Sequence, residues 1–225
     1  MKQFFALIDQ LNASSAADHA AIEARIWAAH GVERAVMTLD MSNFSMFVRR
    51  NGILPYLCKI RRMHQATEPV VRSSHGEVVK YEADNLMAVF ADCGDAVAAA
   101  VRINHAIAGV GSVAADAAAG EQLAVSIGID YGRFLLIPGE DCYGDAVNRA
   151  FKLGEDLARA GEILITEEVR KRLGDSPPYG FRQELLSVSG IEMIAFRVQY
   201  ETTDADTREA NSPGVLTSPP APPSA

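Results

Sequence analysis

The sequence has little of what marks several large classes of protein. It contains three cysteines, Cys58, Cys93 and Cys142, and no CxxC pair. An odd number at this spacing argues against a disulfide framework or a cysteine zinc site and indicates reduced thiols. No apolar run approaches the roughly 18 residues of a membrane-spanning helix, and the chain reaches Asp9 too early for a secretory signal. We therefore predict a cytoplasmic protein without a membrane span.

Positive charge is scarce as well. Lysine and arginine number 21 against 29 aspartates and glutamates, so the formal net charge of the 225-residue chain is −8. A protein that binds nucleic acid regardless of its sequence needs a basic surface, so we expect no nucleic-acid partner. The composition that is present, 48% hydrophobic and 22% charged, is typical of a globular domain with a sizeable buried core.

Composition and hydrophobic periodicity divide the chain into three parts. Residues 1–33 carry two apolar stripes at helical spacing and predict a helical hairpin, capped at its second helix by Asp18, that packs on the domain or on a second copy. Residues 34–201 alternate between strand-like and helix-like segments and are predicted to form the folded domain. Residues 202–225 are rich in proline, alanine and serine, cannot build a core, and are predicted to be disordered.

The order of elements in the middle part predicts an α+β fold. Strand, helix, strand, strand, helix and strand follow one another, which is the split βαβ, ferredoxin-like arrangement with later additions. The predicted elements are a strand over 34–40, a helix that Pro55 kinks or interrupts, a β-hairpin over 77–90 with its turn at Asp84-Asn85, a helix over 92–107, separate strands over 122–130 and 133–137, a strand over 162–165, a helix over 167–173, and strands over 181–188 and 191–198.

One stretch of the chain combines three polar side chains of different kinds. Asp141 precedes a tight turn at Gly144, and Asn148 and Lys152 follow one helical turn apart on the same helix face. Together they supply an acceptor for a base edge, a donor for a sugar and a cation for phosphate. The alternative is a common strand-to-helix turn followed by a solvated lysine, and this short motif alone does not decide between the two.

Two further carboxylates end predicted strands. Asp40 can simply start the following helix, and Asp84 can simply form the hairpin turn. The predicted topology, however, makes Asp40 and Asp84 neighbours, and two clustered carboxylates are costly unless a cation lies between them. Mg²⁺ is the usual cation where phosphates are nearby, and the free N–H groups at the following helix N-terminus suit phosphate oxygens.

Taken together, four motifs resemble those of the catalytic domain of class III nucleotidyl cyclases, the adenylyl and guanylyl cyclases. The resemblance covers roughly residues 34–198, and the motifs occur in the family's order. They are Leu39–Ser45, similar to the first metal motif; Val78–Asp84, similar to the K-x-x-G-D hairpin; Asp141–Lys152, which keeps every interval of D-x-x-G-x-x-V-N-x-A-x-R; and Gly161–Val169, similar to the G-E-I strand and helix.

The resemblance implies a homodimer that converts ATP into 3′,5′-cyclic AMP and pyrophosphate at composite interface sites. Asp40 and Asp84 of one protomer would hold two Mg²⁺ or Mn²⁺ ions per site, helped by the Met41 carbonyl. The family pattern assigns the remaining roles as follows: substrate binding to Asn43, Phe44 and Ser45; base recognition to Lys80 and Asp141 of the other protomer; ribose positioning to Asn148; and transition-state stabilisation to Lys152.

The pair that would read the base favours ATP. Lys80 can donate to N1 of adenine, and the Asp141 carboxylate can accept from the exocyclic amine. Guanine presents a carbonyl and an N–H there, and guanylyl cyclases typically carry Glu and Cys at the corresponding positions.

Four departures from the family pattern keep other functions open. Lys152 replaces an arginine, Ala83 replaces the hairpin glycine, the segment 132–141 is short, and Ser189 stands near a usual phosphate-binding lysine. One alternative is a catalytically weakened homologue that acts as a nucleotide-binding or dimerisation module. The other is a cyclase for another nucleotide, GTP or a pyrimidine. Retention of both metal carboxylates favours an active enzyme.

Overall fold

The computed structural model describes residues 1–42, 48–49, 52–110, 123–188 and 191–200. The predicted substrate-binding residues Asn43, Phe44 and Ser45 lie outside the described residues, as do Ser189 and the C-terminal tail. The three-part division of the chain therefore stays a prediction. No helix in the described ranges is long and apolar enough to cross a membrane.

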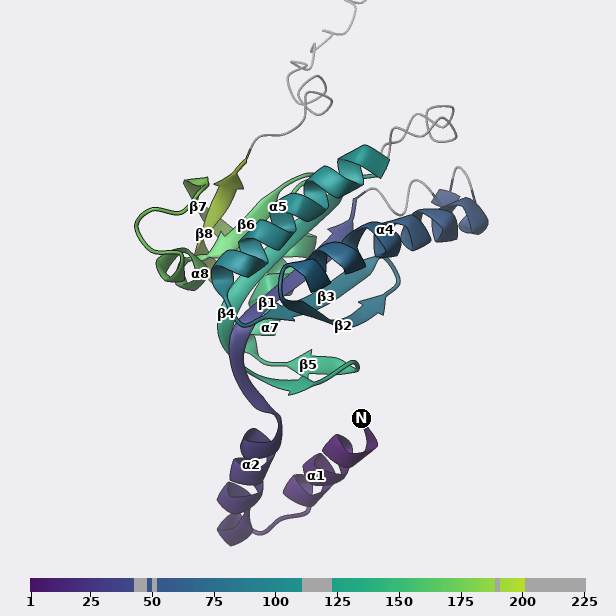
Figure 1. The fold of residues 1–225 in the computed structure, drawn as a ribbon. Helices are drawn as coiled ribbons and strands as arrows, with labels where there is room; N and C mark the ends of the chain where they lie inside the picture. Colours follow the sequence, from purple (N-terminus) through teal and green to yellow (C-terminus); the bar gives the residue numbers. More distant parts are fainter. Residues whose placement is uncertain (43–47, 50–51, 111–122, 189–190, 201–225) are drawn as a thin grey trace, which may run out of the picture.

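An eight-stranded mixed sheet forms the centre of the molecule (Figure 1). Seven strands follow the order β2-β3-β1-β4-β6-β8-β7, and β5 pairs with the end of β4. β4 and β6 are parallel, whereas β1 is antiparallel to both of its neighbours. The strands are β1 (Gly31–Met41), β2 (Gly76–Glu82), β3 (Asn85–Phe90), β4 (Val125–Ile137), β5 (Asp141–Tyr143), β6 (Ile163–Thr166), β7 (Gly180–Val188) and β8 (Ile191–Gln199).

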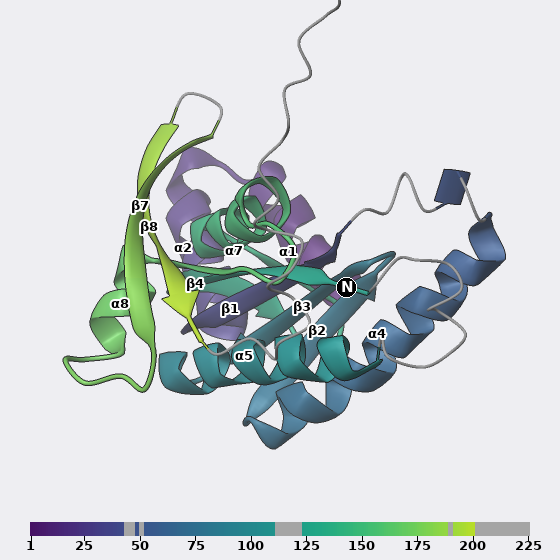
Figure 2. The same ribbon diagram turned by 90° about the horizontal axis from the view of Figure 1, so that it is seen from above.

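Helices cover both faces of the sheet. α4 and α5 lie on one face and α7 on the other, while the α1–α2 hairpin extends from the start of β1 (Figures 1 and 2). The order β1-α4-β2-β3-α5-β4 confirms the predicted ferredoxin-like α+β fold. The helices are α1 (Lys2–Asn12), α2 (Ala16–His30), α4 (Ile53–Ser73), α5 (Cys93–Val110), α7 (Asp145–Phe151), the π-helix η1 (Lys152–Leu157) and α8 (Glu167–Arg172).

The alternation of side chains along β1 decides which face Asp40 occupies. Leu39 and Met41 are buried in the core with α4 and α5. Val36 belongs to the core with α7, and the Thr38 hydroxyl donates to the carbonyl of Ala150 at 2.9 Å. Because successive strand residues point to opposite faces, Asp40 follows Thr38 onto the side of α7 and η1.

One predicted break in the sheet is wrong, and one predicted turn is displaced. The strands predicted over 122–130 and 133–137 are one continuous strand, β4, because Tyr131 and Gly132 stay paired with β1. The hairpin turn falls one residue earlier than predicted, at Ala83 and Asp84, because Asn85 already pairs with β2 at Glu82.

Two helix starts also differ from the prediction. Ser15, not Asp18, caps α2, and its hydroxyl accepts a hydrogen bond from the backbone N–H of Asp18. α4 begins at Ile53, after the non-helical Gly52, so Pro55 lies in its first turn, where a missing backbone N–H leaves no helical bond unmade.

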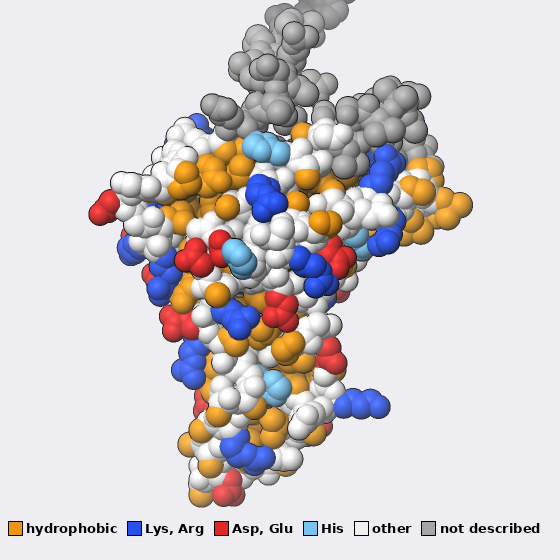
Figure 3. Space-filling model, in the orientation of Figure 1, with side chains coloured by type: hydrophobic (Ala, Val, Ile, Leu, Met, Phe, Trp, Pro, Cys, Tyr) orange, Lys and Arg blue, Asp and Glu red, His pale blue; other side chains and the backbone are white. Residues whose placement is uncertain are grey.

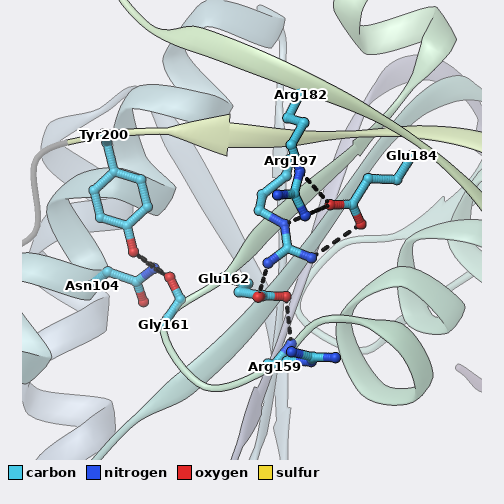
Figure 4. A network of polar contacts seen from close by, with 8 residues as sticks. All are labelled: Asn104, Arg159, Gly161, Glu162, Arg182, Glu184, Arg197 and Tyr200. Atoms are coloured by element: carbon cyan, nitrogen blue, oxygen red, sulfur yellow. Dashed lines mark hydrogen bonds and ion pairs between the residues drawn. The ribbon is translucent and has the colours of Figure 1, made fainter. Parts of the chain in front are cut away.

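A polar network ties the chain that leaves η1 to the distal strands (Figure 4). Glu162, just before β6, forms an ion pair with Arg197 of β8, and the Arg197 guanidinium also bonds both oxygens of Glu184 on β7 at 3.0 Å. Next to it, Asn104 of α5 donates to the carbonyl of Gly161 at 3.0 Å. These contacts fix the exit of η1 from two sides.

Candidate active site

The structure brings Asp40 and Asp84 together where β1 ends beside the β2–β3 hairpin. Burial and, after it, the negative charges of Asp84 and Glu155 together raise the pKa of Asp40 to about 7, against a backbone hydrogen bond from Met41 that lowers it. Negative charges act on the pKa of a carboxyl group in this way when they lie near it. The predicted proximity of Asp40 and Asp84 is therefore observed, and their role as metal ligands stays a prediction.

The third carboxylate, Glu155, was not predicted from the sequence. Its carboxylate accepts a hydrogen bond of 2.7 Å from the side-chain amide of Asn85, beside Asp84. Burial raises the pKa of Glu155, and the charges of Asp156 and Asp84 add to that effect. Glu155 lies in η1, whose π-helical winding cannot be read from a 3.6-residue periodicity.

A close contact of two glycines positions η1 on the sheet. A side chain on Gly154 would lie 2.9 Å from the Thr38 hydroxyl, and one on Gly128 would lie 2.2 Å from the carbonyl of Ala150. The helix backbone therefore rests directly on β1 and β4, with no side chain between them. This contact is what places Glu155 against the end of β1.

Tyr56 of α4 completes the surroundings of Asp84. Its side chain is 3% exposed, and burial raises its pKa above the usual range, together with the negative charge of Asp84. The sequence analysis did not single out Tyr56. Its helical spacing with Ile60 and Met63 carried a signal, because it places all three on the inward face.

The cluster of carboxylates fits a divalent cation that also binds phosphates. Among the described residues, no three His, Cys, Asp or Glu side chains are gathered tightly enough to hold a metal ion by themselves. Mg²⁺ is commonly held by one or two carboxylates, with substrate phosphates and water as its other ligands. Asp40 and Asp84 meet that requirement, and a cation between them would offset the repulsion that raises the pKa of Asp40.

Lys80 and Asp141 face each other across β2 and β5. The Lys80 ammonium lies 3.2 Å from both Asp141 oxygens and 2.7 Å from Glu82. Burial alone would lower the pKa of Lys80, but its hydrogen bonds to Glu82 and Asp141 and their charges outweigh burial and raise it. The two residues predicted to read a base are thus adjacent, with a cation beside an anion.

The short β4–β5 hairpin holds Asp141 in place. Ile137 pairs with Asp141 across the hairpin, and Gly139 takes a positive φ of 70° in the turn. The backbone N–H of Cys142 donates to one Asp141 oxygen at 2.9 Å, and the Tyr143 hydroxyl donates to the other at 3.2 Å. Tyr143 is a further contact that the sequence analysis missed.

Asn148 of α7 and Lys152, the first residue of η1, have no side-chain partners in the part of the chain that the structure describes. Asn148 is exposed and Lys152 is half-buried. The neighbouring Arg149 is already engaged, because its guanidinium bonds the fully buried Asp130 at 2.6 Å and also pairs with Asp145. Of these two neighbouring cations, Lys152 and not Arg149 therefore remains available to a ligand.

Comparison with known proteins gives a fold and one distant relative. No model of a known protein family matches the sequence. "Putative adenylate cyclase 3" of Rhizobium meliloti (strain 1021) is 23% identical over 137 residues, which are 61% of this chain. The match spans 22% of that relative's length.

Three solved structures resemble the chain over about three quarters of its length. The catalytic core of a rhodopsin-guanylyl cyclase with converted specificity, in complex with ATPαS, has a TM-score of 0.64 at 21% identity and covers 75% of this chain and 98% of its own. The guanylate cyclase domain of RhGC from Catenaria anguillulae, in complex with GTP, has a TM-score of 0.64 at 19% identity, with coverages of 77% and 98%. The adenylyl cyclase CyaB from P. aeruginosa has a TM-score of 0.62 at 19% identity, also with coverages of 77% and 98%.

Proposed function

From the fold of a class III nucleotidyl cyclase catalytic domain, we propose that this chain converts ATP into 3′,5′-cyclic AMP and pyrophosphate. The observation that carries the proposal is one arrangement of charges. Asp40 and Asp84 converge at the end of β1, while Lys80 and Asp141 pair on β2 and β5. The first pair suits metal-bound phosphates and the second suits a base edge.

The residues of the chain divide the chemistry between them. Two Mg²⁺ or Mn²⁺ ions at Asp40 and Asp84 would lower the pKa of the ribose 3′-hydroxyl and neutralise the triphosphate. The Asn148 amide orients the ribose so that the 3′-oxygen faces the α-phosphate. The Lys152 ammonium stabilises the negative charge that develops on the transferring phosphoryl group and on leaving pyrophosphate.

Base selection follows from the donors and acceptors of the second pair. The Lys80 ammonium donates to N1 of adenine, and an Asp141 oxygen accepts from the N6 amine. Guanine would set its N1–H against the Lys80 donor and its carbonyl against the Asp141 acceptor. Leaving buried polar groups unpaired in this way costs about 1–3 kcal/mol, which favours ATP by roughly tenfold or more.

The proposal includes a homodimer with a site at each end of the interface. The start of α4 exposes an apolar surface next to Tyr56, formed by Ile53, Leu54 (71% exposed) and Leu57 (Figure 3). A second copy related by a two-fold axis would cover this surface. Each copy would then supply Asp40 and Asp84 to one site and Lys80 and Asp141 to the other.

The test is incubation of the purified protein with each nucleoside triphosphate and Mn²⁺ or Mg²⁺, with products resolved by mass. Cyclic AMP from ATP is the expected product, and it should disappear when the metal is chelated. Cyclic GMP or a cyclic pyrimidine nucleotide as the main product would overturn the base assignment. Binding of nucleotide without any product would favour the second candidate, a nucleotide-binding module, for which the replacements at Lys152 and Ala83 argue.

A further inference from the structure

The N-terminal hairpin reaches the residue proposed to read the base. Phe4 of α1 is almost fully buried, in an apolar cluster with Ile26 of α2 and Ile137 of β4. On one side, the Phe4 ring stacks on the ring of Tyr143, with centroids 5.6 Å apart and planes inclined by 4°. The hairpin thus contacts β5, the strand that carries Asp141 (Figure 1).

Tyr143 connects this stack to Asp141. The Tyr143 hydroxyl donates to the same Asp141 oxygen that lies 3.2 Å from the Lys80 ammonium. With the backbone N–H of Cys142 on the other oxygen, the donors fix the plane in which the carboxylate lies. Burial and the charge of Asp141 raise the pKa of Tyr143, so its hydroxyl remains a donor near neutral pH.

We propose that Tyr143 is a positioning residue for base recognition and that α1 holds it in place through the ring of Phe4. Tyr143 is 38% exposed, so without the stack its side chain would be free to turn into solvent and leave Asp141 with one donor fewer. Movement of α1 then changes nucleotide affinity and base choice, while the phosphate chemistry at Asp40 stays intact. The inference rests on the proposed function wherever it predicts an effect on turnover.

The first variant, Tyr143→Phe, keeps the stacked ring and removes only the hydroxyl. The KM for ATP should rise about three- to tenfold, as expected for the loss of one typical hydrogen bond, with kcat within about twofold. The preference for ATP over GTP should fall by a similar factor. An unchanged KM and an unchanged preference would overturn the proposal.

The second variant, Phe4→Leu, keeps an apolar side chain in the cluster and removes the planar ring. It should move KM and base preference in the same direction as Tyr143→Phe, by a smaller factor. Phe5→Leu is the matched control, because Phe5 is 46% exposed and touches Phe4 edge-on without stacking on Tyr143. In the Tyr143→Phe background, Phe4→Leu should have no further effect, since its action passes through the hydroxyl.

Equilibrium binding of ATP and GTP, with the thermal unfolding midpoint, is measured for every variant beside turnover. A wild-type protein that binds ATP without producing cyclic AMP would reject the proposed function, while the affinities of the variants still test Tyr143. Equal effects of Phe4→Leu and Phe5→Leu, or a loss of kcat that follows the unfolding midpoint, would reduce the stack to a structural role and overturn the inference. A wild-type protein that neither binds nor converts nucleotide would overturn both.

Discussion

At the scale of single residues, Asp40 makes stability depend on pH in a direction unusual for an aspartate. Its pKa is raised to about 7 in the fold, against about 3.9 in an unfolded chain. Between these values the folded protein binds more protons than the unfolded one. The stability of the metal-free protein should therefore be highest below about pH 4 as far as this group is concerned, and should fall as pH rises to about 7.

Replacing the Asp40 carboxylate should raise the stability of the metal-free protein while it abolishes activity. In chelator at pH 8, Asp40→Asn should have a higher thermal unfolding midpoint than wild type, because a buried negative charge is removed, and the difference should shrink at pH 5. Mn²⁺ should raise the midpoint of wild type by binding the folded state, and raise that of Asp40→Asn far less.

The exposed Asp175 offers a matched control for this experiment. Asp175→Asn should follow wild type at both pH values and with Mn²⁺. Activity of Asp40→Asn should be abolished. A variant that is less stable than wild type at pH 8, or equally stabilised by Mn²⁺, would contradict the placement of Asp40 in a cation site.

Lys152 should act on the chemical step. Arg149 of α7 is held by Asp130 and Asp145, so Lys152, at the start of η1, is the nearby cation left to face a triphosphate. Lys152→Ala should lower kcat by on the order of a hundredfold with little change in KM, because the lost charge acts mainly in the transition state. Lys152→Arg should hold or raise kcat, since arginine adds a planar pair of donors.

Kinetics with Mg²⁺-ATP decide the role of Lys152, with Lys171→Ala as the control. Lys171 is exposed on α8 and pairs with Glu167 one turn away, so its loss should be nearly silent. If Lys152→Ala were as fast as wild type, Lys152 would be a surface lysine and the site would lack its expected cation.

At the scale of elements, the β2–β3 hairpin carries backbone strain beside Asp84. Ala83 has a φ of 51°, in the left-handed region that costs an L-residue about 1–2 kcal/mol. Ala83→Gly should relieve that strain and raise the free energy of unfolding by about 1 kcal/mol, less than the full strain because glycine gains entropy in the unfolded chain. Urea unfolding measures this difference.

The same Ala→Gly substitution within a helix should have the opposite effect on stability. Ala20 is exposed within α2, where glycine is less favourable than alanine by about 1 kcal/mol, so Ala20→Gly should destabilise the protein. Cyclase activity of Ala83→Gly should be retained, because the left-handed turn that presents Asp84 is kept. A destabilised Ala83→Gly would show that the methyl group of Ala83 contributes contacts that outweigh the strain.

Some neighbouring side chains and strands could be predicted from the sequence, and others could not. The predicted split βαβ topology anticipated the adjacency of Asp40 and Asp84, and the family resemblance paired Lys80 with Asp141. Glu155 was missed because its position depends on a π-helical turn and on the contact between two glycines distant in sequence. The continuity of β4 was missed because Tyr131 and Gly132 resemble a turn until β1 pairs with them.

At the scale of the whole molecule, the order of strands and helices was predictable because one split βαβ unit allows few arrangements. The contact between the N-terminal hairpin and β5 was not predictable, since neither apolar stripe indicates the surface that it packs on. The assembly of two copies also lies beyond one chain, because the exposed start of α4 indicates only that an apolar surface is available.

A mixing experiment tests whether sites are shared between protomers. Asp40→Ala and Asp141→Ala should each be inactive alone, because each removes one half of both sites in a symmetric dimer. If the two variants are mixed and exchange subunits, about half of the dimers are hybrids, and each hybrid has one intact site. The mixture should then recover roughly a quarter of the wild-type activity.

The double variant Asp40→Ala/Asp141→Ala is the matched control. Mixed with wild type, it should leave a different residual activity depending on whether sites are shared between protomers or lie within one chain. We compare an equal mixture of wild type and double variant with an all-wild-type sample of the same total concentration. If sites are shared, the mixture should keep about a quarter of that activity, because every site in a hybrid dimer then lacks one half. If each site lay within one chain, hybrids would keep one working site and about half of the activity would remain. Exchange of subunits is verified by mass on differently tagged copies. Recovery in the first mixture together with a quarter in the second supports composite sites, whereas no recovery with a half remaining places each site within a single chain.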